Sequence, residues 1–327
     1  VQTCALPIWH KIVMTGTPVE NSITDLWSQI NFLNPGILGH FNYFSKKFVS
    51  SIEKEGNEED TKSLKNIVRP FILRRTKEQV ASDLPEKIES TMWCEMGDEQ
   101  KMAYDTIKEK VRSSIFLDIK QNGLGNGKLS VINGMLKLRQ ICNAGGLVKD
   151  EDIVCTDSIK TDILVDELKN IIPNHKALVF SQFTGMLDLL EISFKKNQIP
   201  FCRLDGSTPI SKRQELVDSF QQTDSTEKVF LISLKAGNAG LNLTAADYVF
   251  LLDPWWNPAA EAQAIDRAHR IGQKKTVFTY KFISKETVEE KILSLQQRKL
   301  DLANELVTSD ESILRNLSED EVLDLLS

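Results

Sequence analysis

Short apolar runs alternate with amphipathic stretches through the second half of the chain. The strand-length run at 229–233 is apolar up to its last residue, Ser233, and 212–220 carries apolar residues at the spacing of one helix face. Strands that are apolar on both faces, separated by amphipathic helices, are typical of a parallel sheet covered on both sides. The pattern therefore predicts an α/β fold. The predicted strands are 177–180, 201–204, 229–233, 248–252 and 277–283, and the predicted helices are 158–172, 186–195, 212–220 and 259–268.

The first part of the chain shows a weaker pattern. An apolar run at 10–14 predicts a short strand, and weak alternation at 88–96 predicts the last strand of a preceding lobe. Apolar residues at helical spacing over 100–118 predict a protruding helix. A long amphipathic helix is predicted to begin near Thr287.

The glycine-rich segment 123–128 has to be tested as a phosphate-binding loop. A Walker loop needs a glycine at position 122 and Ser or Thr after the lysine, but Asn122 and Leu129 stand there. The segment also follows a predicted helix, whereas a phosphate loop follows a strand. We therefore interpret it as a flexible loop between two helices. No other stretch of the sequence has the pattern, and no Asp-Glu-x-His box occurs in it.

Composition narrows the class of protein. The 327 residues allow two domains, and 41% hydrophobic with 26% charged residues is typical of a globular protein. No apolar run approaches membrane length, so we expect a cytoplasmic protein without a membrane partner. The net charge of −6 argues against a surface coated by nucleic acid but permits a local basic cleft. Five cysteines without a Cys-x-x-Cys pair, and four histidines away from them, predict reduced thiols and no metal site.

Two arginines stand close together in the stretch from 263 to 273. On a helix, Gln263, Arg267 and Arg270 are four and three residues apart, so their side chains leave one face together. Guanidiniums present planar forks of donors, and a pair of them beside an amide suits a phosphate chain. For an arbitrary Arg-x-x-Arg, exposed arginines paired to neighbouring carboxylates would be the commoner interpretation. The segments that precede this stretch favour the phosphate.

Those segments form a recognisable series. They comprise a strand, a glycine-rich loop that ends at Gly240, Leu-Asn-Leu-Thr at 241–244, a second strand, and Asp-Pro-Trp-Trp-Asn-Pro at 253–258. Together with 263–273, this run resembles the fifth and sixth motifs of the Swi/Snf-type ATPases, superfamily-two motors that translocate on double-stranded DNA. Thr-Gly-Thr-Pro at 15–18, followed by Asn21, resembles the third motif of the same family. The resemblance extends from residue 10 to the last residue and implies a RecA-like fold.

The resemblance implies that ATP binds between two RecA-like lobes. Arg267 and Arg270 would stabilise charge on the transferring phosphoryl group, and Gln263 would orient one of them or contact the nucleotide. Gly240 and Asn242 would contact the nucleotide as well. In the family, the phosphate loop and the carboxylates that hold Mg²⁺ lie upstream of the third motif, so most ligands of ATP with Mg²⁺ are expected outside this chain. The residues implied to couple nucleotide state to DNA grip are Thr15, Gly16, Thr17 and Asn21.

Three loops that follow predicted strands carry hydroxyls, amides and exposed backbone N–H groups, which suit sequence-independent phosphate binding. Ligands of such sheets bind beyond the carboxyl ends of the strands, so we expect the motif residues there. Trp255 and Trp256 point in opposite directions if the chain is extended, and one of them is expected in the core. The resemblance places Trp256 at the DNA minor groove, although a buried role is open for both. Arg74, Arg75 and Lys77 either contact the DNA backbone or pin the lobes. The candidate DNA contacts are Ser181, Gln182, Ser207, Thr208, Lys235, Gly237, Thr244 and Trp256.

The expected chain has three parts: the remnant of a first ATPase lobe with a helical protrusion (1–130), a second RecA-like lobe (131–286) and C-terminal brace helices (287–327). We expect the C-terminal part of an ATP-dependent translocase on double-stranded DNA, inactive without its first lobe, that remodels protein–DNA complexes. The expected partners are double-stranded DNA and DNA-bound proteins such as RNA polymerase, and the expected setting is a monomer at a bacterial nucleoid. A non-catalytic DNA-binding module is the alternative. An RNA helicase is disfavoured by the Trp-Trp-Asn-Pro segment and the brace.

Overall fold

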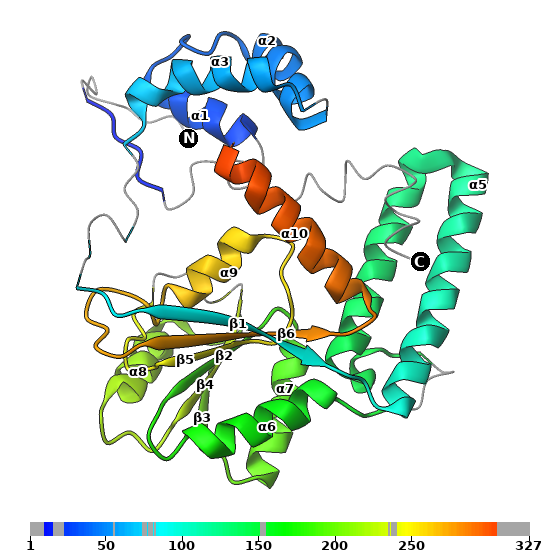
Figure 1. Cartoon of the computed structure of the whole chain (residues 1–327), viewed down its shortest axis with the longest axis vertical. Coiled ribbons are helices and arrows are strands. Elements are labelled where there is room, and N and C mark those ends of the chain that lie inside the picture. The colour runs from blue at the N-terminus through cyan, green and yellow to red at the C-terminus, as the bar shows by residue number, and fades with distance from the viewer. Residues whose placement is uncertain are drawn as a thin grey trace. The chain divides into compact units, whose positions relative to one another are not determined.

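The structure is a computed structural model of the whole chain (Figure 1). It describes residues 10–15, 23–54, 56–73, 77, 81, 83–150, 155–234, 236 and 241–305. The chain divides into two compact units, residues 1–76 with 297–317 and residues 77–296 with 318–327. Within the described ranges, no helix combines the length and the apolar character needed to cross a bilayer.

The first unit is built from short helices. Their apolar side chains form one core that includes Ile30, Phe44 and Leu64. The side chain of Asn57 caps one of the helices by accepting hydrogen bonds from two backbone N–H groups of its first turn. The helices are α1 (Ile23–Leu33), α2 (Phe41–Phe44), the π-helix η1 (Ser45–Lys54), α3 (Glu58–Val68) and the 3-10 helix η2 (Arg69–Phe71).

The prediction of a strand at 10–14 was wrong. These residues have an irregular backbone, and the side chain of Ile12 is 83% exposed. A strand needs a neighbouring strand to accept and donate its backbone hydrogen bonds. No strand among the described residues of the first unit offers one.

The second unit is built on a parallel sheet of six strands. Their order across the sheet is β1-β6-β5-β2-β4-β3, and every neighbouring pair is parallel. Five of these strands were predicted from the apolar runs, so the α/β fold class is confirmed. The strands are β1 (Lys87–Cys94), β2 (Ala177–Ser181), β3 (Phe201–Leu204), β4 (Val229–Ser233), β5 (Tyr248–Leu251) and β6 (Val277–Ser284).

Strand β1 lies at the edge of this sheet. It pairs with β6 along its whole length, from Lys87 beside Val277 to Cys94 beside Ser284. We predicted a strand here but assigned it to the preceding lobe, and that assignment was wrong. Side-chain alternation marks a strand, whereas the sheet to which it belongs depends on a partner far along the chain.

Helices cover both faces of the sheet (Figure 1). Successive residues of β2 alternate between the two cores, with Ala177 and Val179 in one and Leu178 and Phe180 in the other. Both faces are therefore apolar, which is why the strands form continuous apolar runs in the sequence. α6 (Ile159–Ile171) and α7 (Thr184–Lys196) pack on one face, and α8 (Ile210–Gln221) and α9 (Pro258–Ile265) pack on the other.

The 46-residue helix α5 (Asp98–Asn143) folds back on itself and is followed by the 3-10 helix η3 (Gly145–Leu147). A Cβ built on Gly134 would lie 2.4 Å from Cγ1 of Val111, a residue that a straight helix would hold far away. Figure 1 shows the two arms of α5 side by side. The helix predicted over 100–118 is present. Helical backbone continues through 123–128, so the prediction of a flexible loop there was wrong. The glycines there bend the helix without ending it.

The long helix predicted near Thr287 is present as α10 (Val288–Glu305). It follows β6 directly. Its residues divide between the two units, with Gln296 the last of the second unit before the chain enters the first.

Candidate functional site

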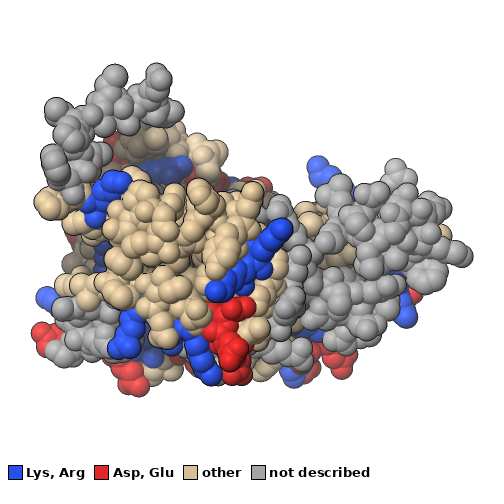
Figure 2. Space-filling view, turned by 90° about the horizontal axis from the view of Figure 1, so that it is seen from above, with Lys and Arg blue, Asp and Glu red and all other residues tan. Residues whose placement is uncertain are grey.

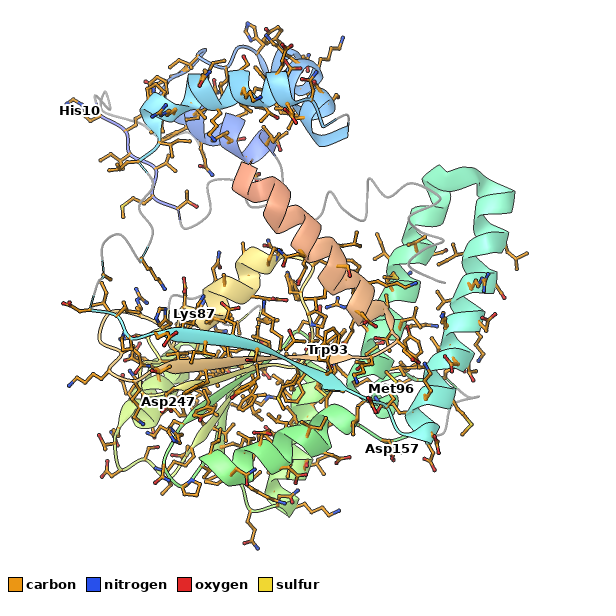
Figure 3. The ribbon with its side chains drawn as sticks, in the orientation of Figure 1. His10, Lys87, Trp93, Met96, Asp157 and Asp247 are labelled. Carbon is orange, nitrogen blue, oxygen red and sulfur yellow. The ribbon has the colours of Figure 1, made fainter. Side chains whose placement is uncertain are left out.

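In the second unit, the described residues that were predicted to be functional lie at two opposite edges of the sheet. All strands run in one direction, so the loops that follow β2, β3 and β5 leave from the carboxyl edge, and the loops that precede β1, β5 and β6 lie at the amino edge. Figure 3 marks this direction, with Lys87 and Asp247 at the amino edge and Trp93 toward the carboxyl edge. We expected all motif residues at the carboxyl edge. For the two arginines this was wrong.

Arg267 and Arg270 stand on a series of turns after α9 and not on the helix itself. α9 ends at Ile265, and the main chain from there to 272 consists of turns and bends. The prediction that Gln263, Arg267 and Arg270 share one face of a helix was therefore wrong. Of the three, only Gln263 lies on α9. Gly272 closes the series with a φ of +105°, a conformation that favours glycine.

Gln273 anchors these turns at the amino edge. Its buried side-chain amide donates to the carbonyl oxygens of Thr244 at 3.1 Å, Ala246 at 2.9 Å and Ala268 at 3.0 Å. Thr244 and Ala246 belong to the loop that precedes β5. These long-range bonds end the helical pattern before Arg267, because the main chain must turn to reach them. The motif contained Gln273, but only its spatial neighbours show what its side chain does.

Burial distinguishes the two arginines. Arg267 is buried and Arg270 is exposed. Burial lowers the pKa of Arg267, the positive charge of Arg270 lowers it further, and the carboxylate of Asp266 opposes both effects. The Nε of Arg267 has no hydrogen-bond partner among the described residues. Two like charges near each other and a buried donor without a partner are costly, and an anion would relieve both costs. The pair therefore fits a polyanion such as the phosphate chain of a nucleotide.

The segment before β1 holds the arginine turns from the other side. The Nζ of Lys77 lies 2.6 Å from Oδ1 of Asp266 and donates to the carbonyl oxygen of His269 at 2.8 Å. The Nε2 of His269 lies 2.8 Å from the carbonyl oxygen of Pro85. Of the two roles left open for Lys77, these contacts favour a structural one. Arg74 and Arg75 lie outside the described residues.

At the carboxyl edge, hydrogen bonds within the loop after β2 and to a neighbouring loop fix its conformation. Ser181 is fully buried, and its hydroxyl accepts a hydrogen bond from the N–H of Phe183 at 3.1 Å. The N–H of Gln182 donates to Oδ2 of Asp253 at 3.0 Å and so ties this loop to the loop after β5. A direct DNA contact of the Ser181 hydroxyl is not supported by this geometry.

The loop after β3 is organised by Asp205. Its Oδ1 accepts hydrogen bonds from the N–H and the hydroxyl of Ser207 at 2.8 and 2.6 Å, and its Oδ2 accepts one from Nε of Arg203 at 2.9 Å. The hydroxyl of Thr208 accepts a hydrogen bond from the N–H of Asp205 at 3.0 Å. Burial alone would raise the pKa of Asp205, but the bonds from Ser207 and Arg203 outweigh burial and lower it. The loop therefore presents Ser207 at the surface in a fixed conformation.

The two tryptophans have different surroundings. Trp255 is partly buried and packs against the core under α8 and α9, and Trp256 is partly buried as well. Its N–H donates to Oε1 of Glu261 on α9 at 2.7 Å. The ring of Trp256 lies over the guanidinium of Arg139, 5.6 Å from its centroid. Arg139 had no predicted role, since it lies in α5, far from both loops in the sequence.

Other predicted site residues are only partly covered by the structure. Asn242 is exposed, and the N–H of the next residue, Leu243, donates to the carbonyl oxygen of Arg267 at 3.0 Å, which brings Asn242 to the arginine turns. The hydroxyl of Thr244 accepts a hydrogen bond from Gln221 at 3.3 Å at the amino edge, away from the other DNA candidates. Thr15 is exposed. The residues outside the described ranges are Gly16, Thr17, Asn21, Lys235, Gly237 and Gly240.

Charged side chains of the described residues are dispersed over the face of the molecule shown in Figure 2. On the face shown in Figure 2, the Lys and Arg side chains of the described residues stand apart and do not form a continuous basic patch. In the part of the chain that the structure describes, no three His, Cys, Asp or Glu side chains gather as the ligands of a metal would.

The chain is similar to proteins of one family along most of its length. Residues 2–147 match the model of the SNF2-related domain, and residues 159–272 match that of the helicase conserved C-terminal domain. The chain is 37% identical to the uncharacterized ATP-dependent helicase MG018 of Mycoplasma genitalium over 96% of its length. It is 34% identical to the TATA-binding protein-associated factor MOT1 of Saccharomyces cerevisiae over 97%.

The fold of the chain is also similar to that of a solved structure. The Sulfolobus solfataricus SWI2/SNF2 ATPase core in complex with dsDNA superimposes with a TM-score of 0.60 at 34% identity, over 95% of this chain and 65% of that one. The chain belongs to the Swi/Snf-type family of helicase-like ATPases. Its parallel sheet is the RecA-like lobe expected of this family. The chain spans only 29% of MG018 and 20% of MOT1, so it corresponds to a minor part of those proteins.

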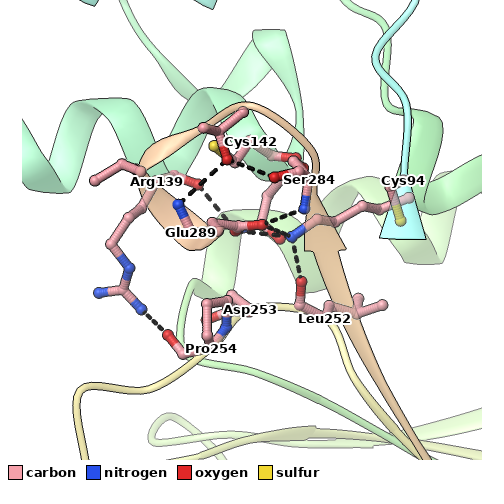
Figure 4. A network of polar contacts seen from close by, with 12 residues as sticks. Cys94, Arg139, Cys142, Leu252, Asp253, Pro254, Ser284 and Glu289 are labelled. Atoms are coloured by element: carbon pink, nitrogen blue, oxygen red, sulfur yellow. Dashed lines mark hydrogen bonds and ion pairs between the residues drawn. The ribbon is translucent and has the colours of Figure 1, made fainter. Parts of the chain in front are cut away.

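In this Swi/Snf-type lobe, a buried polar network lies beside the start of the loop 252–257, called here the double-tryptophan loop because it carries Trp255 and Trp256 (Figure 4). The Nζ of Lys160 contacts both carboxylate oxygens of Glu289, at 2.8 and 2.6 Å, and donates to the carbonyl oxygen of Leu252 at 2.6 Å. Glu289 also accepts a hydrogen bond from the N–H of Ser284 at 2.9 Å. Burial raises the pKa of Glu289, and Lys160 opposes this effect. The network joins α6, the ends of β5 and β6, and the start of α10.

Proposed function

We propose that this chain is the C-terminal part of an ATP-dependent translocase on double-stranded DNA that remodels protein–DNA complexes. The observation that carries the proposal is the buried guanidinium of Arg267, whose Nε lacks a partner among the described residues, beside the second positive charge of Arg270. The likeness to a Swi/Snf-type core in complex with dsDNA supports the choice of DNA as the track. The MOT1 relative, a TATA-binding protein-associated factor, supports a target bound to DNA.

The amino edge would serve the nucleotide. Arg267 and Arg270 would stabilise charge on the transferring phosphoryl group, an effect worth roughly 10³ to 10⁵ in rate for such arginines. Asn242 lies beside them, and Gln263 and Gly240 are assigned to the same group by the family motifs. The phosphate loop that binds ATP and the carboxylates that hold Mg²⁺ would belong to a first lobe outside this chain.

The carboxyl edge would serve the DNA. Gln182, Ser207, Thr208 and Trp256 lie in loops that leave from this edge, and Lys235 and Gly237 belong to the loop that follows β4. Thr244 is better placed to support the arginine turns. The predicted coupling residues of the first unit are Thr15, Gly16, Thr17 and Asn21.

Helix α9 would couple the two edges. It begins directly after the tryptophan pair, where the side chain of Asn257 caps its first turn, and it ends at Ile265, just before Arg267. Its eight residues span about 12 Å as a rigid element. A shift of the double-tryptophan loop on DNA would therefore move the arginine turns.

The division of the chain follows from the same proposal. The second lobe would begin near Lys77 and not at 131, because β1 belongs to its sheet and because the second compact unit starts there. The part before it would belong to the first lobe, and α10 would begin the brace. We further propose a monomer at a bacterial nucleoid whose partners include DNA-bound proteins such as RNA polymerase.

Steady-state ATP hydrolysis tests the proposal. The chain alone and the chain joined to a complete first lobe would each be assayed with and without double-stranded DNA. We expect turnover, and its stimulation by DNA, only in the joined protein. Hydrolysis by the chain alone would contradict the assignment of the phosphate loop to a missing lobe. DNA binding without hydrolysis in the joined protein would favour a non-catalytic module.

The arginine assignment has a matched control. In the joined protein, Arg270→Ala should abolish DNA-stimulated hydrolysis and leave DNA affinity nearly unchanged. Arg112→Ala removes an arginine that is also exposed, on α5 beside Glu109, and should leave both properties intact. Undiminished turnover in the Arg270 variant would remove it from its proposed role.

A further inference from the structure

Arg139 connects α5 to two of the loops at the carboxyl edge, those that follow β2 and β5. Its Cζ lies 5.7 Å from the ring centroid of Phe183 in the loop after β2 and 5.6 Å from that of Trp256 in the loop after β5. It also donates a hydrogen bond to the carbonyl oxygen of Pro254 (Figure 4). A planar guanidinium can stack on a ring with each face and donate from its edge, which an ammonium cannot do.

Burying the positive charge of Arg139 at this place costs free energy. The side chain of Arg139 is 2% exposed, and burial lowers its pKa, opposed by the nearby carboxylates of Asp253 and Glu289. Its Nε has no hydrogen-bond partner among the described residues. An apolar side chain of similar volume would fill the space with less desolvation. A buried cation at this place therefore needs a reason beyond stability.

The contacts of Arg139 supply that reason. They fix the side chain of Trp256, whereas Trp255 is fixed through its backbone by Glu261 of α9 and Gln296 of α10. We propose that Arg139 is a positioning residue that sets the ring of Trp256, together with the loop that carries Phe183, in the orientation in which they meet DNA. The proposal deepens the DNA contact inferred above and rests on it. It adds α5 to the elements that control the DNA-contact loops.

Lys176 is a matched control for a purely structural buried cation. It is 7% exposed, its Nζ lies 5.2 Å from the centroid of Phe220, and it donates to the carbonyl oxygens of Phe220 and Gln222. It stands at the amino end of β2, at the opposite edge of the sheet from Trp256. A change of Lys176 should therefore affect folding without affecting the double-tryptophan loop.

The experiment compares Arg139→Met, Arg139→Lys and Lys176→Met in this chain. Each is paired with the same protein carrying Trp256→Phe, and the difference in emission within each pair reports Trp256 alone. Collisional quenching by acrylamide then measures how accessible the ring is. We expect both Arg139 variants to raise the quenching of Trp256, and Lys176→Met to leave it unchanged. Because this readout needs no DNA, it tests the positioning even if the proposed DNA contact fails.

Binding to a short double-stranded DNA is the second readout. Arg139→Met should weaken it about ten-fold, as expected for loss of a desolvated cation–π contact, and Trp256→Ala should add little in the Arg139→Met background. Unchanged quenching in the folded variants, or independent losses from the two substitutions, would overturn the proposal. If Arg139→Met does not fold, Arg139→Lys decides, because it keeps the buried charge. Increased quenching without any DNA binding by the parent chain would instead refute the DNA contact while retaining the positioning.

Discussion

Lys160 and Glu289 form an ion pair 2.6 Å apart in which neither side chain is exposed. The pair joins α6 to the first turn of α10, and it lies beside the carbonyl oxygen of Leu252 at the end of β5. A buried ion pair is weak support for stability as a whole, but removal of one partner leaves an uncompensated charge. The pair therefore fixes which surfaces of α6 and α10 meet.

Replacing Lys160 by Met should lower the free energy of unfolding by about 3–5 kcal/mol, because Glu289 would remain buried without its counter-charge. The double variant Lys160→Met with Glu289→Leu should recover most of that loss, since no charge remains to be buried. Urea unfolding followed by circular dichroism measures all three proteins. Additive losses in the double variant would contradict this account.

Gly134→Ala should destabilise the helical hairpin of α5. The new methyl group would lie 2.4 Å from Cγ1 of Val111, a side chain with little rotational freedom. We expect a loss of about 1–3 kcal/mol from overpacking, although alanine favours a helix by up to about 1 kcal/mol over glycine. Val111→Ala should make the same change harmless. Gly146→Ala is the control, since its Cβ would meet nothing within 4 Å.

The sequence was most informative where local pattern and tertiary structure agree. The central strands are buried on both faces, so each appears as an apolar run whatever its neighbours, and β4 matches its predicted bounds. The wrong predictions concern features set by distant contacts. β1 has its partner in β6, and the helix that carries Gln263 ends early because Gln273 draws the main chain toward Thr244.

The candidate site was predicted unevenly for the same reason. The family motifs named Arg267, Arg270 and Trp256, because such residues stand in continuous stretches. They gave no role to Arg139 and left two roles open for Lys77, because both residues reach the site from other elements. Their side chains are ordinary polar residues in the sequence, and only the fold brings them to Trp256 and Asp266.

Gln273→Glu should be more damaging than Gln273→Met. Methionine loses the hydrogen bonds to three carbonyl oxygens and should cost about 1–3 kcal/mol, whereas a carboxylate would also place negative charge against those oxygens. Gln214→Glu on the exposed side of α8 is the matched control and should change little. Thermal unfolding ranks the four proteins. Equal stability of the two Gln273 variants would show that the three carbonyl contacts do not matter.

Stability should depend on the charge of Asp205 at acid pH. The bonds from Ser207 and Arg203 hold its pKa below the ordinary value of 3.8 despite burial, so the ionised form stabilises the folded state. That contribution is complete above pH 3.8 and is lost as the pH falls below it. Asp205→Asn should therefore lower stability by about 1 kcal/mol at pH 7, with a difference that narrows below about pH 4. Urea unfolding across this range measures it, and a constant difference would contradict the assignment.

The contact between Lys77 and Asp266 should matter more for turnover than for stability. Their side chains are 37% and 43% exposed, so the ion pair contributes at most about 1 kcal/mol to folding. Lys77 nevertheless fixes the turns that carry Arg267, and small displacements of a phosphate-binding group are costly in rate. In the protein joined to a complete first lobe, Lys77→Met should reduce DNA-stimulated hydrolysis by about ten-fold with an unchanged melting temperature.

Lys101→Met supplies the comparison for that variant. Lys101 is similarly exposed and pairs with Asp105 and Glu286, away from the arginine turns. The same change of side chain there should leave hydrolysis and melting temperature unaltered. If the two variants hydrolyse ATP equally well, Lys77 does not position the arginines, and Gln273 would be the principal anchor of their turns. If only Lys77→Met slows hydrolysis, the segment before β1 controls the geometry of the arginine turns at the amino edge of the sheet.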